Sequence, residues 1–155
     1  ESMFPVQDVR RYCKNYAVNA ILSFYAEKAE KNGISMQVTI QMADPPVIPE
    51  TEFCVLVGNL LENAVDACAD TDAEIQSFIR LHVVQTGSSM LSITADNTSS
   101  GSPNWSGDKL LSTKHSGYGI GTESIRMTAE RYSGDARFRW KDGIFYASVM
   151  LNPQV

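Results

Sequence analysis

Two side-chain amides and two carboxylates recur at helical spacing near the middle of the chain. At positions i, i+3, i+4 and i+7 of one apolar segment stand Asn59, Glu62, Asn63 and Asp66. A rotation of about 100° per residue places all four on one helix face, with no cation among them. Amide and carboxylate oxygens are hard ligands that hold Mg²⁺ or its water shell. The stripe therefore predicts a metal–phosphate site, and the alternative is an ordinary solvated face of an amphipathic helix.

Farther along, glycines two positions apart precede another predicted helix. These are Gly117, Gly119 and Gly121, and Lys114 lies just before them. Glycine lets the backbone approach a ligand closely, and a helix N-terminus offers unpaired N–H groups at the positive end of its dipole. The pattern predicts a phosphate cradle, although a flexible loop leading into a helix explains it about as well. Neither the Rossmann glycine spacing nor the Gly-Lys-Ser/Thr of a P-loop is present.

A third polar group closes a predicted strand. The inward row of this strand consists of Leu91, Ile93 and Ala95. Alternation adds Asn97 to that row and points Asp96 the other way. A buried polar side chain is costly unless it is paired, and its oxygen can accept the exocyclic N–H of an adenine. The alternative is an Asx turn that simply ends the strand.

Periodicity predicts the elements that position these residues. Apolar residues at helical spacing predict helices over residues 6–31, 53–68 and 123–132, the second beginning near residue 50. Alternation predicts strands over residues 35–42, 79–84, 91–95, 137–141 and 144–151, with the second and third antiparallel and the last two joined at Asp142-Gly143. Residues 98–109 read as a mobile loop and residues 113–122 as a glycine-spaced turn. Helices and strands do not alternate regularly, so an α+β two-layer sandwich fits better than a doubly wound parallel sheet.

Composition bounds the class of protein. The 155 residues fit one domain, with 43% hydrophobic and 20% charged residues. The net charge of −5 does not suggest a nucleic-acid surface. No apolar run approaches the ~18 residues of a membrane span. The three cysteines, Cys13, Cys54 and Cys68, have no metal-type spacing, so we expect buried free thiols in a reducing compartment.

Three segments, in this order, resemble the N box, the G1 box and the G2 box of the GHKL ATPases: residues 59–64, 96–98 and 114–121. That superfamily includes gyrase, a heat-shock chaperone, histidine kinases and mismatch-repair ATPases. The chain looks most like the catalytic ATP-binding domain of sensor histidine kinases of the accessory-gene-regulator (peptide-sensing) type, over about residues 16–151. The stretches that carry this closer resemblance are Asn19-Ala20-Ile21-Leu22-Ser23, Ala29, Gly33-Ile34 and Arg131-Tyr132-Ser133-Gly134.

The resemblance implies a Bergerat-type fold. This is an α+β two-layer sandwich with a mixed, mostly antiparallel sheet and about three helices on one face. ATP would lie between helices and sheet, under a lid formed by residues 98–114. The whole chain would be a single ATP-binding catalytic domain, in which residues 1–3 resemble a cloning scar before an internal fragment.

The resemblance also implies roles for individual residues. Asn63 would coordinate a Mg²⁺ that bridges the phosphates, and Asn59 would contact the phosphates or the metal's water. Glu62 would support these two amides in the catalytic site, with Asp66 as a further polar group in cofactor binding. The remaining expected contacts to the phosphates come from Lys114, Gly117, Gly119, Ile120, Gly121 and Thr122. The usual G1 box is Asp-x-Gly-x-Gly, and here both glycines are missing; we expect Asn97 to contact adenine, with Asp96 as the alternative.

The implied function is phosphoryl transfer. The domain would bind Mg²⁺ and ATP and phosphorylate a histidine on a separate dimerisation domain of the same protein, with a response regulator downstream. The chain's two histidines, His82 and His115, lack the context of a phosphoacceptor, so we expect no activity of this fragment alone. We expect a cytoplasmic domain of a membrane-anchored protein, without direct membrane contact and without a nucleic-acid partner. Alternatives are a stand-alone serine kinase of the anti-sigma-factor kind, or a degenerate nucleotide-sensing or partner-binding module, which the altered G1 box favours.

Overall fold

A computed structural model describes residues 12–69, 71–72, 74–100, 104–106, 109–111 and 120–153, with backbone only for residues 104–106, 109–111 and 120. Its elements, in chain order, are α1 (Tyr16–Lys31), β1 (Ser35–Gln41), α2 (Glu50–Ala69), β2 (Phe78–Thr86), β3 (Met90–Thr98), β4 (Asn104–Ser106), β5 (Lys109–Leu111), α3 (Ile120–Arg131), β6 (Asp135–Lys141) and β7 (Ile144–Leu151). None of the described helices combines the length and apolar character needed to cross a membrane.

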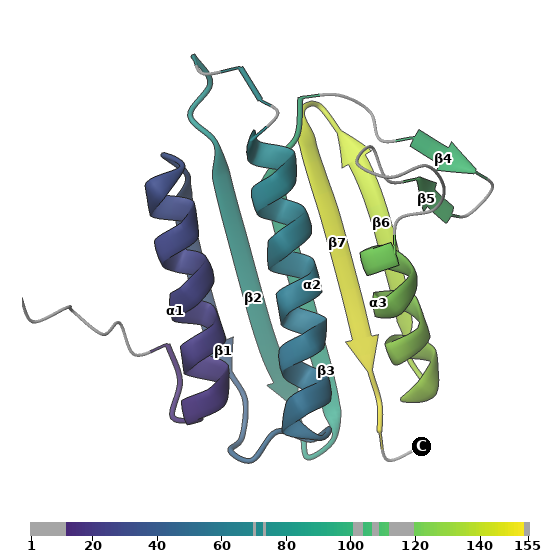
Figure 1. The fold of residues 1–155 in the computed structure, drawn as a ribbon. Helices are drawn as coiled ribbons and strands as arrows, with labels where there is room; N and C mark the ends of the chain where they lie inside the picture. The colour runs from purple at the N-terminus through teal and green to yellow at the C-terminus, as the bar shows by residue number, and fades with distance from the viewer. Residues whose placement is uncertain are drawn as a thin grey trace, which may run out of the picture.

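Five strands form one mixed sheet, and the helices form a second layer. The strand order is β1-β2-β3-β7-β6, with β1 parallel to β2 and every other neighbouring pair antiparallel. The described helices α1, α2 and α3 lie side by side on one face of this sheet, with α2 in the middle (Figure 1). The α+β two-layer sandwich with a mostly antiparallel sheet is therefore confirmed.

The core lies between α2 and the central strands. Phe53 and Leu61 of α2 are fully buried, as are Leu81 of β2 and Ile93 of β3. Burying each such side chain contributes about 1.5–3 kcal/mol. The buried residues of β2 and β3 are the alternate ones that the sequence pattern predicts. This packing buries the side of α2 that faces the sheet, and polar residues of α2 lie at its flanks, where Glu62 contacts α1 and Asn59 contacts α3.

The last hairpin forms as predicted. Asp142 and Gly143 connect β6 to β7 with φ angles of 50° and 80°. Two successive left-handed residues are the signature of the type I′ turn, whose twist matches that of paired strands. The strand β7 of this hairpin pairs with β3, which carries the candidate residues Asp96 and Asn97.

The predicted first helix is too long at its N-terminal side. Residues 12–15 are not helical, and residues 6–11 lie outside the described part of the chain. Asn15 ends the non-helical segment, since its Oδ1 accepts a hydrogen bond from the Val18 N–H at 3.0 Å and caps α1. The Asn15 Nδ2 also donates to Asp44 and Glu50, at 2.9 and 2.7 Å, which ties the start of α1 to the start of α2.

Two further boundaries differ from the prediction. Across the end of the expected mobile loop, residues 98–109, β4 and β5 pair as an antiparallel ribbon with Trp105 opposite Leu110. This pairing satisfies backbone groups that an irregular loop would leave to water. Helix α3 starts at Ile120, three residues before the predicted start, so Gly121 and Thr122 belong to its first turn rather than to a turn before it.

Candidate functional site

The two amides of the α2 stripe lie against α3. A Cβ atom added to Gly121 would lie 3.1 Å from Asn63 Nδ2 and 3.2 Å from Asn63 Oδ1. One turn back along α2, Asn59 Nδ2 donates a hydrogen bond of 3.3 Å to Ser124 Oγ. Both amides are half-buried. The structure thus brings together the two amides of the stripe and the helix that begins with the last glycine of the predicted cradle.

The first turn of α3 supplies the other half of this arrangement. It contains Ile120, Gly121 and Thr122, and Thr122 is buried. The first four N–H groups of an α-helix have no acceptor within the helix, and that end carries the positive end of the helix dipole. A neutral amide oxygen beside such N–H donors suits an anionic ligand accompanied by a hard cation. Among the described residues, no group of three or more His, Cys, Asp or Glu side chains could hold a metal ion.

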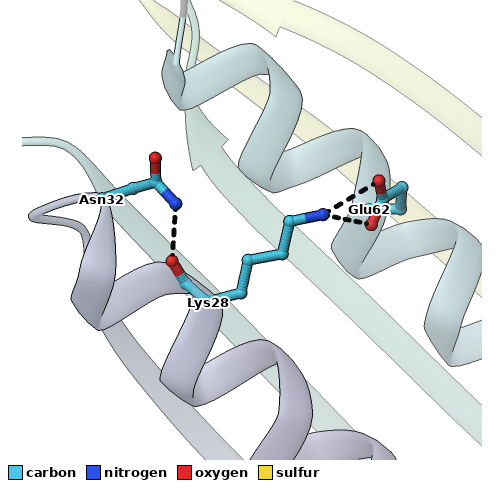
Figure 2. A network of polar contacts seen from close by, with 3 residues as sticks. All are labelled: Lys28, Asn32 and Glu62. Carbon is cyan, nitrogen blue, oxygen red and sulfur yellow. Dashed lines mark hydrogen bonds and ion pairs between the residues drawn. The ribbon is translucent and has the colours of Figure 1, made fainter.

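Glu62, on the same predicted stripe, lies toward α1. Lys28 Nζ of α1 donates to both carboxylate oxygens of Glu62 at 3.1 Å (Figure 2). The backbone of Lys28 is itself engaged, because its carbonyl accepts a 2.7 Å bond from Asn32 Nδ2 (Figure 2). The two side chains of the ion pair are 36% and 42% exposed, which limits the pair to at most about 1 kcal/mol. The stripe is therefore shared between two helices, and the catalytic role expected for Glu62 stays a prediction.

Tyr25 extends this second cluster. Burial, together with the nearby carboxylates of Glu62 and Asp66, raises the pKa of Tyr25 to about 12. The phenol therefore stays protonated at any physiological pH and can donate a hydrogen bond. Asp66, expected among the cofactor-binding residues, is thus close enough to α1 to act on Tyr25.

At the end of β3, Asn97 and Asp96 lie on opposite faces of the sheet. Asn97 is 3% exposed on the face that carries the helices, and its Nδ2 donates to the Thr98 carbonyl at 2.9 Å. Asp96 is paired in register with Arg80 and Tyr146 on the other face. Burial raises the pKa of Asp96, although Arg80 and Arg139 act against this shift. The orientation predicted from strand alternation is confirmed, and the contact with adenine stays a prediction.

Part of the predicted cradle lies outside the described residues. This applies to Lys114, Gly117 and Gly119, to His115, and to residues 101–103, 107–108 and 112–113 of the lid expected over residues 98–114. Of that cradle the structure describes Gly121 and Thr122 fully and Ile120 by its backbone alone. His82 is exposed in the middle of β2, as expected for a sheet residue.

Sequence reasoning missed two partners of the candidate residues. Ser124 receives the hydrogen bond from Asn59, and Lys28 pairs with Glu62. Ser124 stands three positions after Gly121, so helical spacing could have placed both on the face that meets α2. No local signal marks Lys28, because its partner lies on a different helix.

The family assignment follows from a comparison with known domain families. The sequence model of the GHKL domain matches residues 49–152, from the residue before α2 to the one after β7. The chain belongs to the GHKL domain family. The match contains α2, α3 and the end of β3, so every described candidate residue of the site lies within the GHKL domain. No curated protein matches this chain in sequence.

Solved structures share the fold. The catalytic domain of the histidine kinase ThkA, in a nucleotide-free form, matches with a TM-score of 0.65 and 15% identity, over 90% of this chain and 92% of that one. The histidine kinase domain of a blue-light activated kinase from Erythrobacter litoralis gives 0.66 and 14%, over 89% and 61%. A mycobacterial sensor histidine kinase, MprB, gives 0.60 and 14%, over 88% and 93%. These similarities establish that this GHKL domain has the Bergerat α+β sandwich of histidine kinase catalytic domains.

Proposed function

We propose that this GHKL domain binds Mg²⁺-ATP and donates the γ-phosphoryl group to a histidine on a separate dimerisation domain of the same protein. The observation that carries the proposal is the contact between the Asn63 amide and Gly121. It joins a hard neutral ligand to a helix N-terminus, which is the combination that a metal-bound triphosphate requires. The family match and the shared fold support the same assignment.

Each described residue then has a role in binding. Asn63 Oδ1 would hold the Mg²⁺, which supplies charge neutralisation between the phosphates. Asn59, anchored on Ser124, would orient a phosphate oxygen or a metal-bound water. The N–H groups of Ile120, Gly121 and Thr122 would donate to phosphate oxygens, together with Lys114, Gly117 and Gly119 on the preceding segment. Glu62 and Asp66 would support the amide stripe from its α1 side.

We assign the adenine contact to Asn97. Its side chain is buried on the helix-bearing face of the sheet, where a base lying between the two layers would meet it. Asp96 lies on the opposite face beside Arg80. Its Nδ2 donates to the Thr98 carbonyl, so Oδ1 would accept the exocyclic N–H of adenine and would repel the O6 acceptor that guanine presents at the same position.

Catalysis in this proposal rests on positioning and on charge stabilisation. The chain's residues hold the triphosphate so that a histidine nitrogen attacks the γ-phosphorus in line. His82 is exposed within the sheet, so we expect the acceptor to come from the dimerisation domain. We further propose the accessory-gene-regulator type, with a response regulator downstream and a cytoplasmic location, on the support of Asn97 at its G1 position and of the segment 131–134.

Titration calorimetry tests the binding step. We expect the domain to bind ATP with Mg²⁺, and Asn63→Ala to weaken this binding at least about tenfold while the domain stays folded. The matched control is Asn32→Ala, which removes an exposed amide at the end of α1 and should leave the affinity unchanged. Wild-type affinity in Asn63→Ala would contradict the proposal. A domain that binds no ATP at all would instead identify a degenerate partner-binding module.

A further inference from the structure

Helices α2 and α3 run antiparallel and meet at three levels. The contacts pair Asn63 with Gly121, Asn59 with Ser124, and Glu52 with Arg131 and Tyr132. From one level to the next, the residue number decreases along α2 and increases along α3, as expected for antiparallel helices. The first two levels belong to the proposed nucleotide site, and the third lies at the far end of both helices. A shift of α3 by one turn, about 5.4 Å, would break all three levels together.

At the third level, the carboxylate of Glu52 accepts hydrogen bonds from two side chains. Arg131 Nη1 lies 2.5 Å from Glu52 Oε1, and the Tyr132 hydroxyl donates to Glu52 Oε2. The Glu52 side chain is 29% exposed, and Tyr132 is half-buried. Both oxygens of Glu52 are thus committed to consecutive residues at the C-terminal end of α3. Charge-assisted bonds of this kind are stronger and more directional than neutral ones.

The same end of α3 is also fixed to the sheet. The N–H of Gly134 donates to the Ala129 carbonyl at 2.8 Å, and Ser133 adopts a left-handed φ of 56°, which together form a Schellman C-cap. A Cβ atom on Gly134 would lie 1.7 Å from the Met150 carbonyl oxygen of β7, so only glycine fits there. The N–H of Asn152 then donates to the Tyr132 carbonyl at 2.8 Å.

We propose that Glu52 is a positioning residue for nucleotide binding. Through Arg131 and Tyr132 it sets the position of α3 along α2, and thereby holds the first turn of α3 against Asn63. Glu52 and Asn63 are about three turns apart on α2, about 16 Å at the helical rise of about 1.5 Å per residue. Glu52 is therefore too far from Asn63 to touch a ligand bound there, and it acts through α3. The inference rests on the proposed function, because the quantity it controls is the affinity for Mg²⁺-ATP.

Two substitutions release the contact to different extents. Glu52→Ala removes both acceptors, and Tyr132→Phe removes only the hydroxyl donor. At a temperature well below unfolding, we expect Glu52→Ala to weaken Mg²⁺-ATP binding roughly five- to tenfold and Tyr132→Phe to weaken it less. Binding unchanged in both variants overturns the inference.

A matched control separates positioning from stability. Val38→Ala removes methyl groups that pack on the core from β1, at the edge of the sheet opposite to the strands under α3. We expect it to lower the melting temperature at least as much as Glu52→Ala and to leave the affinity for Mg²⁺-ATP unchanged. An equal loss of affinity in Val38→Ala would show that general destabilisation, not the position of α3, explains the effect. The charge swap Glu52→Arg with Arg131→Glu restores the ion pair and should recover most of the affinity, and no recovery would contradict the proposed contact.

The nucleotide-free protein gives a readout that does not depend on function. In a ¹⁵N spectrum, Glu52→Ala should move the signals of the Gly121 N–H and of the Asn63 side-chain amide, and Val38→Ala should leave both in place. Unmoved signals in Glu52→Ala overturn the inference even where the wild-type protein binds Mg²⁺-ATP. Moved signals in a protein that binds no ATP would sustain the positioning effect on α3 while the proposed function fails.

Discussion

The amide of Asn63 leaves no room for a side chain at Gly121, because a methyl group added there would approach Asn63 Nδ2 to 3.1 Å. The contact joins the N-box helix to the helix that follows the glycine segment. Since Gly121 is already helical, its lack of a side chain serves this approach rather than a special backbone angle. The pair therefore offers a test in which a single methyl group is added.

We predict that Gly121→Ala displaces the Asn63 amide and weakens Mg²⁺-ATP binding about tenfold. Alanine favours a helix over glycine by up to about 1 kcal/mol, so thermal stability should be kept or slightly raised while affinity falls. Calorimetry and a melting curve measure the two effects separately. Gly58→Ala is a matched control, because its methyl would lie equally close, 3.1 Å, to Ile21 Cδ1 on the α1 side. Equal affinity losses in both variants would refute a specific contact with Asn63.

Base selectivity tests the assignment at the end of β3. Asn97→Ala should weaken ATP binding roughly tenfold and reduce the preference for ATP over GTP, because a buried hydrogen-bonding group is removed. Asp96→Asn, on the other face of the sheet, should leave both quantities unchanged. Competition between ATP and GTP for each variant decides the point. Loss of selectivity in Asp96→Asn alone would reverse the assignment.

The pH dependence of stability provides an independent check on Asp96. Burial raises the pKa of this carboxyl above its usual 3.8, so the folded protein holds the proton at pH values where the unfolded chain has lost it. Ionisation of Asp96 therefore costs stability as the pH rises through the raised folded value, and the cost is fully present at neutral pH. Asp96→Asn should be more stable than wild type at neutral pH, and this advantage should shrink toward about pH 4.

A control of opposite sign stands on β6. A hydrogen bond from Arg137 holds the pKa of Asp135 below its usual value, so its stabilisation is present above the unfolded pKa and is lost as the pH falls through the folded one. Asp135→Asn should therefore be slightly less stable than wild type at neutral pH. Urea unfolding over the acidic range measures both variants. The same sign in both would show that the environment of Asp96 is misassigned.

The cysteines should differ in reactivity. Burial raises the pKa of Cys68 to about 11, and its thiol lies near the carbonyls of Phe78 and Thr98. At pH 8 about one molecule in a thousand then carries a Cys68 thiolate. Iodoacetamide should modify the half-buried Cys13 and Cys54 first, and Cys68 only on global unfolding. Mass spectrometry of the labelled peptides measures the three rates. Labelling of Cys68 as fast as that of Cys13 and Cys54 would contradict the prediction.

Alternation was sufficient to predict the strands of the five-stranded sheet, although not their order. Along β3, the pattern of Leu91, Ile93 and Ala95 implied that Asn97 faces inward, and the burial of these residues agrees. The hairpin at Asp142-Gly143 could likewise be predicted from local sequence, because its left-handed turn depends on two adjacent residues. Local patterns succeed here because a strand that is buried on one face constrains every second side chain.

Predictions that needed a second element were less successful. The stripe on α2 predicted a common face for Asn63 and Glu62, but adjacent residues differ by about 100°, so each reaches a different neighbouring helix. A single helix pattern cannot tell which neighbour stands on which side. The early start predicted for the first helix has another cause. Apolar periodicity continued through the segment and outweighed the local cap signal of Asn15, whose Oδ1 accepts from the Val18 N–H. The bonds from Asn15 to Asp44 and Glu50 add contacts that are distant in sequence.

The most direct test of the central claim is the effect of bound Mn²⁺-ATP, in place of Mg²⁺-ATP, on the ¹⁵N spectrum of the domain. The paramagnetic ion broadens signals that lie near it. We predict that the Asn63 side-chain amide and the Gly121 N–H broaden together and earliest, and that the exposed His82 on β2 keeps its signal. Sharp signals from Asn63 and Gly121 in a domain saturated with Mn²⁺-ATP would contradict a single triphosphate site between α2 and α3.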